Sequence, residues 1–286
     1  MFKIIIGVFR SDVIFCWFAS VYASIGVVFG RVVGIQSIIV VGGVDVAKEK
    51  ELNYGIWLSA WKSKLVRYAL QHADRVLVVD PCLKEDAVRL AKYDGKNIVY
   101  LPTGYDVLFW KPMGEKEPIV LTVAVVHDEQ RVRLKGIDTL IETARKLPEM
   151  QFIVIGTHPE LVLKFQPPAN MTFHPTMERK SLLPYYRQSK VYCQPSRREG
   201  LPNTLCEAML CGCVPVATEV GGNGTAIGDT GILVPSNDPE ALCNALMKAM
   251  KSTDDIGAKA RSRIVALFPK EKRERDLLRV IKGIKS

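Results

Sequence analysis

The first hundred residues alternate between two hydrophobic patterns. Short runs that are apolar throughout, typical of buried strands, are followed by longer stretches whose apolar residues recur every three or four positions, as in helices. Such an alternation predicts a parallel sheet that is covered on both faces. The expected strands are Lys3–Val8, Asp12–Phe15, Ser37–Val41, Arg75–Val79 and Ile98–Leu101, and the expected helices are 17–33, Leu58–His72 and Pro81–Tyr93.

Residues 107–116 are rich in Trp, Lys, Pro and Gly, which is typical of a linker, and the alternation resumes after them. A long β-branched run at Pro118–Val126 is followed by a polar, basic loop and an amphipathic helix at Ile137–Leu147. We therefore expect an α/β fold with domains at 1–110 and 117–270 and a basic C-terminal helix at 271–286. The other expected elements are strands at Gln151–Gly156, Met171–Phe173, Val191–Gln194 and Val214–Ala217 and a helix at Glu178–Gln188.

Residues 13–30 contain no charge over 18 positions, which is long enough for a membrane-spanning helix. A strand followed by a buried helix is the favoured interpretation, because Ser, Gly and Ala are frequent and because Gly30 and Gly34 separate this run from a second strand. That second strand ends in glycines followed by Asp45. A signal peptide fits poorly, since it would need a shorter apolar core and a small-residue cleavage site.

The net charge of +9 and the isoelectric point near 9.2 favour an anionic partner. Nucleoside diphosphates, anionic lipid surfaces and nucleic acid all qualify, but nucleic acid is the least favoured because no recognised binding motif is present. The seven cysteines are scattered, which is typical of reduced thiols in a cytosolic protein. Cys206, Cys211 and Cys213 are interpreted as packing residues, because no histidine or fourth cysteine is near enough in sequence to complete a metal site.

The segment Pro195–Gly222 contains the candidate ligand-binding groups. It reads PSRREGLPNTLCEAMLCGCVPVATEVGG, and its pattern predicts a loop after a strand, a helix beginning near Asn203 and then another strand. Unpaired amides at a helix start favour phosphate, which here concerns Asn203, Thr204 and Leu205. Glu199 in the loop and Glu207 one turn inside the helix can each accept hydrogen bonds from hydroxyls. This layout suits a nucleotide that is joined to a sugar.

Glu-x7-Glu within EGLPNTLCEAMLCG, followed by PVATEVGGN, resembles the donor-site signature of retaining glycosyltransferases of family 4, the glycosyl transferases group 1. GGVDVAKEKELNYG and ADRVLVVD with NIVYLPTGYD are similar to the N-terminal domain of that family, and TGILVPSNDPEALCNALMKAM to its C-terminal domain, with Asp238 as a helix cap. The resemblance implies the GT-B fold, two Rossmann-type parallel-sheet domains, with the N-terminal one lacking its first part.

The resemblance also implies an activity. A hexose would pass from a nucleoside diphosphate sugar to a hydroxyl acceptor, either a glycan or a lipid-linked molecule, with retention of configuration and without a cofactor or a metal. Two alternatives stay open: a nucleotide-sugar-binding subunit that needs a partner chain, and a sugar-nucleotide epimerase on the same fold.

Site roles follow from the same resemblance. Glu199 would orient the donor sugar and Lys135 would bind the pyrophosphate, so these two are the expected catalytic residues. Glu207 would bind the ribose, and the base would lie near His174–Met177. The expected donor-binding set also contains Gly200, Leu201, Asn203, Thr204 and Leu205. The family usually has Gly-Arg after the first strand of this domain, where this chain has Ala124 and Val125. Arg131 or Arg133 is therefore expected to supply the second cation.

From Lys259 onward the chain contains ten basic and three acidic residues. A solvated basic face is the favoured interpretation, and contact with an anionic membrane surface is the alternative. The expected location is therefore the cytoplasm, with peripheral attachment to the inner face of the membrane as its variant.

Overall fold

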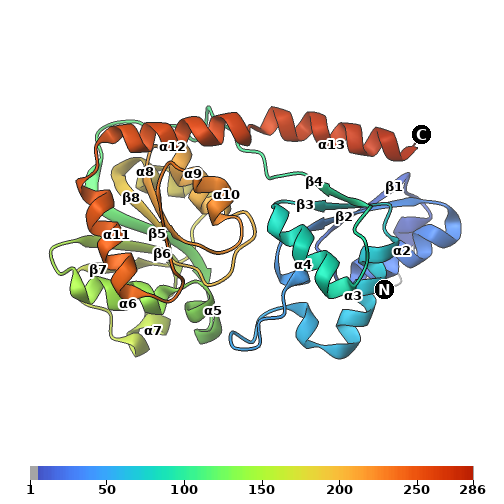
Figure 1. The fold of residues 1–286 in the computed structure, drawn as a ribbon, viewed down its shortest axis with the longest axis horizontal. Helices are drawn as coiled ribbons and strands as arrows, with labels where there is room; N and C mark the ends of the chain where they lie inside the picture. Colours follow the sequence, from blue (N-terminus) through green and yellow to red (C-terminus); the bar gives the residue numbers. More distant parts are fainter. Residues whose placement is uncertain (1–5, 286) are drawn as a thin grey trace. The chain divides into compact units, whose positions relative to one another are not determined.

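The computed structural model describes residues 6–285 (Figure 1). The chain divides into two compact units. The first consists of Met1–Thr103 together with Glu271–Ser286, and the second of Gly104–Lys270. Both are α/β units built on a parallel sheet, as the sequence predicts.

The first unit contains a four-stranded sheet whose spatial order β1-β2-β3-β4 follows the chain. Two of its helices start at a capping side chain: Ser20 accepts a hydrogen bond from the Ala23 amide, and Asp80 accepts one from the Cys82 amide. Near the end of the chain, Arg273 Nη1 of α13 donates to the Leu101 carbonyl at 2.9 Å. The elements are β1 (Val13–Trp17), α2 (Val21–Val33), β2 (Gln36–Val41), η1 (Val44–Val46), η2 (Ile56–Leu58), α3 (Ala60–His72), β3 (Arg75–Val78), α4 (Pro81–Ala91), β4 (Ile98–Tyr100) and α13 (Lys270–Lys285).

The uncharged segment 13–30 forms strand β1 and most of helix α2, which confirms the favoured interpretation. Within residues 6–285, no helix combines the length and the apolar composition that crossing a membrane requires. The expected strand Lys3–Val8 lies partly outside the described residues, and its described part is helical, so that prediction is wrong there. The Arg10 and Ser11 amides bond the carbonyls of Gly7 and Val8, which satisfies this backbone locally instead of in a sheet.

Strand β1 lies at the edge of its sheet. Helix α2 covers one of its faces closely, since a Cβ at Gly30 would lie 2.6 Å from Ile14 Cδ1. On the other face the rings of Phe15 and Trp17 meet edge to face at 6.0 Å, and both side chains are exposed.

The second unit contains a six-stranded parallel sheet in the order β10-β9-β8-β5-β6-β7. Its strands are β5 (Glu117–Val126), β6 (Gln151–Thr157), β7 (Met171–His174), β8 (Ser189–Gln194), β9 (Val214–Thr218) and β10 (Ile232–Val234). Its helices are α5 (Glu129–Leu134), α6 (Ile137–Lys146), α7 (Pro159–Val162), η3 (Leu163–Phe165), η4 (Arg179–Leu182), α8 (Leu183–Gln188), α9 (Asn203–Leu210), α10 (Asn223–Ile227), α11 (Pro239–Lys251) and α12 (Asp254–Leu267).

The strand order places a switch point at the centre of this sheet. The chain runs outward from β5 to β6 and β7, then returns to β8 on the other side of β5 and continues outward to β9 and β10. Helices α6 and α11 contact each other and pack with the apolar core, while α9 contacts β8, β9 and α12. In such sheets a crevice opens beyond the carboxyl ends of the two central strands, and ligands bind there. The fold therefore predicts that a ligand binds beside the residues that follow β5 and β8.

The loop expected after Val126 is partly helical, which corrects the prediction. Residues Glu129–Leu134 form helix α5, because the Asp128 carboxylate accepts a hydrogen bond from the Arg131 amide and caps the helix. Asp238 caps α11 in the same way, as expected, by accepting from the Glu240 and Ala241 amides.

Candidate active site

The candidate site lies where the segments after β5, β8 and β9 meet. Glycines permit their close approach: Gly136 has φ +66°, and a Cβ there would lie 1.9 Å from the Pro195 carbonyl oxygen. Gly221, with φ +50°, would place a Cβ 2.0 Å from the Glu199 carbonyl oxygen. The Arg197 amide donates to the Leu134 carbonyl at 2.9 Å, which ties two of these segments together. The backbone thus fixes the positions of the side chains that follow each strand.

Lys135 and Glu199, which are 64 residues apart in the sequence, form an ion pair at this point. Lys135 Nζ lies 2.6 Å from Glu199 Oε1, and the two side chains are 20% and 10% exposed. Gln194, the last residue of β8, donates from Nε2 to the same oxygen at 2.9 Å, and the Tyr192 hydroxyl donates to Gln194 Oε1 at 3.0 Å. The structure therefore brings the two expected catalytic residues together and holds the carboxylate in a defined orientation.

Glu207 lies one turn inside α9 and is buried, with a side chain that is 2% exposed. Arg179 donates to its Oε1 from Nε at 2.6 Å and lies 2.5 Å away through Nη2, while the Tyr186 hydroxyl donates to Oε2 at 3.3 Å. Burial raises the pKa of Glu207, and the Arg179 charge and the two hydrogen-bonding partners oppose that rise. The Arg179 guanidinium also lies over the Trp110 ring, 5.4 Å from its centroid.

Helix α9 begins at Asn203, and its first intrahelical hydrogen bond runs from the Cys206 amide to the Pro202 carbonyl. The amides of Asn203, Thr204 and Leu205 therefore precede the helical ladder and point toward its open end, where the helix dipole favours an anion. The Asn203 side chain does not cap the helix, since its Oδ1 accepts a hydrogen bond from the Tyr105 hydroxyl at 2.9 Å. Gly200 and Leu201 are buried in the loop that leads to this helix.

Arg131 and Arg133 lie on α5, and Arg133 is exposed. Within residues 6–285 neither guanidinium forms an ion pair with the residues around Glu199. Arg197 instead pairs with Asp138 at 2.5 Å beside the loop, and burial raises the pKa of Asp138 while the Arg197 charge opposes the rise. The role of a second cation beside Lys135 stays a prediction.

Sequence reasoning missed several side chains that shape this site, namely Tyr105, Trp110, Arg179, Tyr186 and Gln194. Arg179 follows β7 by a few residues, close to the expected base-binding loop, but nothing in the local pattern connects it with Glu207. The three clustered cysteines, Cys206, Cys211 and Cys213, are buried, and the described residues contain no group of three potential metal ligands.

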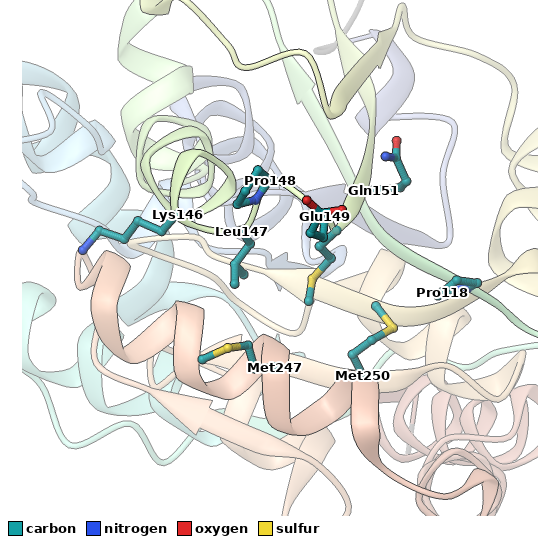
Figure 2. Close-up of a pocket in the computed structure, with 9 residues that line it drawn as sticks. Pro118, Lys146, Leu147, Pro148, Glu149, Gln151, Met247 and Met250 are labelled. Atoms are coloured by element: carbon teal, nitrogen blue, oxygen red, sulfur yellow. The ribbon is translucent and has the colours of Figure 1, made fainter.

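A separate apolar hollow of about 420 Å³ lies at the opposite end of the sheet (Figure 2). Pro118 and Gln151, which line it, stand at the amino ends of β5 and β6, and Met247 and Met250 project into it from α11. The hollow lies at the opposite ends of these strands from Lys135 and Glu199, so it is not part of the candidate site.

Residues 117–252 match the family model described as Glycosyl transferases group 1. The chain is 30% identical over 187 residues to D-inositol 3-phosphate glycosyltransferase of Xylanimonas cellulosilytica, a match that covers 57% of this chain and 45% of that protein. It is 24% identical over 198 residues to one subunit of the phosphatidylinositol N-acetylglucosaminyltransferase of Arabidopsis thaliana, covering 66% of this chain and 44% of the relative. The matched region thus spans less than half the length of these curated relatives.

Two solved structures have the same fold. Sucrose-phosphate synthase (tll1590) from Thermosynechococcus elongatus matches with a TM-score of 0.80 at 22% identity, covering 99% of this chain and 76% of that one. Anabaena Alr3699/HepE in complex with UDP and glucose matches with a TM-score of 0.83 at 14% identity, covering 98% and 80%. The chain therefore has the α/β fold of GT-B glycosyltransferases, with two parallel-sheet units.

Proposed function

We propose that the protein is a retaining glycosyltransferase that transfers a hexose from a nucleoside diphosphate sugar to a hydroxyl acceptor. One observation carries this proposal: the Lys135–Glu199 ion pair lies beside the start of α9, and the buried carboxylate of Glu207 lies one turn deeper. A cation and the amides at a helix start can bind a diphosphate, and two carboxylates can accept hydrogen bonds from the hydroxyls of a sugar and a ribose. The match of residues 117–252 to the glycosyl transferases group 1 model supports the same conclusion.

Each group has a role in donor binding under this proposal. Lys135 and the amides of residues 203–205 hold the diphosphate, and each charge-assisted hydrogen bond to it contributes about 1.5–3 kcal/mol. Glu207 accepts hydrogen bonds from the ribose hydroxyls. Glu199 turns from Lys135 toward the hydroxyls of the sugar, and Gln194 keeps it aimed at the site.

Catalysis then rests mainly on stabilising the leaving group. The bond between the anomeric carbon and the diphosphate oxygen breaks as the acceptor oxygen bonds the same carbon on the same face. The acceptor hydroxyl proton passes to the departing phosphate oxygen, so no enzymic nucleophile is required. Lys135 and the helix amides receive the charge that develops on the diphosphate.

We further propose that transfer needs neither a cofactor nor a metal. The two cationic sources, Lys135 and the start of α9, supply positive charge where a divalent ion would otherwise act. The role of Arg131 or Arg133 as an additional phosphate ligand is part of this proposal, because both lie on the helix that leads to Lys135.

The acceptor class that we favour is a lipid-linked hydroxyl at an anionic membrane surface. Exposed basic residues recur along one stripe of α13, at Lys272, Arg275, Arg279 and Lys282. Cations arranged in this way attract anionic headgroups with about 1 kcal/mol each. One curated relative has a name that refers to phosphatidylinositol, which is a lipid, and this supports the choice of acceptor.

Two alternatives make different predictions. A donor-binding subunit completed by another chain would bind the nucleotide without turnover. Two observations favour this alternative over an epimerase: Phe15 and Trp17 are exposed at the sheet edge, and the name of one relative contains the word subunit. An epimerase would convert the donor in the absence of any acceptor. Product analysis with and without an acceptor separates the three functions.

The first experiment is thermal unfolding of the purified chain with UDP, GDP and ADP in excess. A ligand at about a hundred times its dissociation constant stabilises the folded state by roughly 2.7 kcal/mol, which should raise the melting temperature by a few degrees. We expect one nucleotide to produce the largest shift, since the three share the ribose and the diphosphate and differ only in the base, which we expect to lie near His174–Met177. A cooperative unfolding transition that none of the three nucleotides moves would contradict the proposed donor site.

A further inference from the structure

Arg179 is held by two different groups at the edge of the candidate site. Its guanidinium contacts Glu207 Oε1 through Nε and Nη2, at 2.6 and 2.5 Å, and it lies over the ring of the buried Trp110. Even so, the Arg179 side chain is 60% exposed. An arginine that is fixed on one side by a carboxylate and on another by an aromatic ring loses much of its rotamer freedom, so its position is defined although solvent reaches it.

The remaining groups that face Glu207 are uncharged. Tyr186 donates to Oε2, and the phenols of Tyr105 and Tyr192 lie close enough to interact with the carboxylate. Burial raises the pKa of all three phenols well above the ordinary value, so they stay neutral at physiological pH. Arg179 is therefore the cation, among the residues that the structure describes, that pairs with this carboxylate.

We propose that Arg179 is a positioning residue for the donor's ribose: it keeps Glu207 ionised and aimed so that the carboxylate accepts hydrogen bonds from the 2′ and 3′ hydroxyls. This inference rests on the proposed function of Glu207 as the ribose ligand. A buried carboxylate that loses its cation takes up a proton, and a protonated carboxyl no longer offers two charged acceptor oxygens.

The carboxylate can accept enough hydrogen bonds for this double role. An ionised carboxylate accepts about four hydrogen bonds, and Arg179 and Tyr186 supply three in the ligand-free structure. A small rotation of the guanidinium that keeps Nε bonded frees one acceptor position on Oε1, while a second remains on Oε2. The ribose diol then occupies one position on each oxygen.

The test compares two ligands, UDP and 2′,3′-dideoxy-UDP, or the matching pair if thermal unfolding selects another base. Dissociation constants are measured between about pH 6 and pH 9, because burial raises the pKa of Glu207 and loss of Arg179 removes the charge that opposes this rise. The diphosphate titrates in both ligands, so the ratio of the two constants isolates the ribose contact. We expect the parent to prefer the ribonucleotide about tenfold or more over this whole range.

In Arg179→Met the preference should fall toward one at the low end of the range and recover as the pH rises, because Glu207 then ionises without its partner. Arg179→Lys should retain an intermediate preference, since it restores the charge without the fork of the guanidinium. Lys180→Met is the matched control: it removes one exposed cation from the same 3₁₀ helix and should leave the ratio unchanged.

The outcomes separate this inference from the proposed function. A parent chain that binds no nucleotide, or that does not discriminate between the two ligands, overturns the ribose site and the inference with it. A discriminating parent whose preference survives unchanged in Arg179→Met at every pH overturns the role of Arg179 alone. Tighter ribonucleotide binding by Arg179→Met would also overturn it, because Arg179 would then compete with the ribose.

Discussion

The Tyr105 hydroxyl donates a hydrogen bond to Asn203 Oδ1 at 2.9 Å, across 98 residues of sequence. Tyr105 is completely buried, and its backbone is bonded on both sides to the end of the same unit: its amide donates to the Phe268 carbonyl, and the Lys270 amide donates to its carbonyl. Tyr105 thus links the beginning of the second unit, the segment that follows α12 and the first residue of α9. The position of the helix start that we assign to the diphosphate depends on this link.

Tyr105→Phe should lower the free energy of unfolding by about 1 kcal/mol, because one buried hydrogen bond is lost and the Asn203 oxygen stays without its donor. Nucleotide affinity should also fall, since the start of α9 is less firmly held. Urea unfolding and nucleotide titration measure the two effects. Tyr22→Phe in the first unit is the control: its side chain is exposed and its hydroxyl makes no hydrogen bond within residues 6–285, so this change should alter neither quantity.

Substitution of the two glutamates should have different effects on binding and turnover. Glu207→Ala should weaken binding of the bare nucleotide about tenfold or more, because it removes the acceptor that we assign to the ribose. Glu199→Ala should leave that affinity within a few-fold and lower turnover by about a hundredfold or more, because a misoriented sugar reaches the reactive geometry rarely. Steady-state kinetics and calorimetric titration on both variants measure this split. Parent-like behaviour of both variants would show that the site is assigned wrongly.

Gly136→Ala should destabilise the second unit by about 3 kcal/mol or more, because the left-handed φ and the collision of the new Cβ with the Pro195 carbonyl act together. Gly114→Ala is the control, since its φ is +77° but no atom lies within 4 Å of the new Cβ. It should cost only the conformational part, about 1–2 kcal/mol. Equal losses in urea unfolding would contradict the close approach of the segments after β5 and β8.

Prolonged treatment with a chelator should leave transfer activity unchanged, because Lys135 and the amides of α9 supply the positive charge at the leaving group. Activity is measured on the same preparation before treatment, after it and after a divalent cation is restored. Loss of turnover that only the divalent ion reverses would contradict the proposal of a metal-independent reaction.

Local chemistry explains which features were predictable. Strands β2 and β3 consist mainly of apolar residues that need burial on both faces, and such a run can be recognised from the local sequence alone. Asp238 followed by a proline and a glutamate is a helix start that depends on neighbouring residues alone. The loop after Val126 was mispredicted because the cap at Asp128 turns a polar segment into helix α5, and its charged side chains concealed that tendency.

The sequence by itself determined the parallel α/β architecture and the strand, loop and helix of Pro195–Gly222, because the patterns of apolar residues that specify strands and helices, and the alternation of the two, are visible along the chain. Only the tertiary structure decided which side chains meet at the site. Arg179 reaches Glu207 across 28 residues, and Lys135 pairs with Glu199 across 64. The Lys135–Glu199 contact exists because β5 and β8 are neighbours at the switch point of the sheet and because Gly136 lets the segments that follow these strands touch. The Arg179–Glu207 contact joins η4, which precedes β8, to α9, which follows β8. Strand order and backbone approach are properties of the whole fold, and no local pattern encodes them.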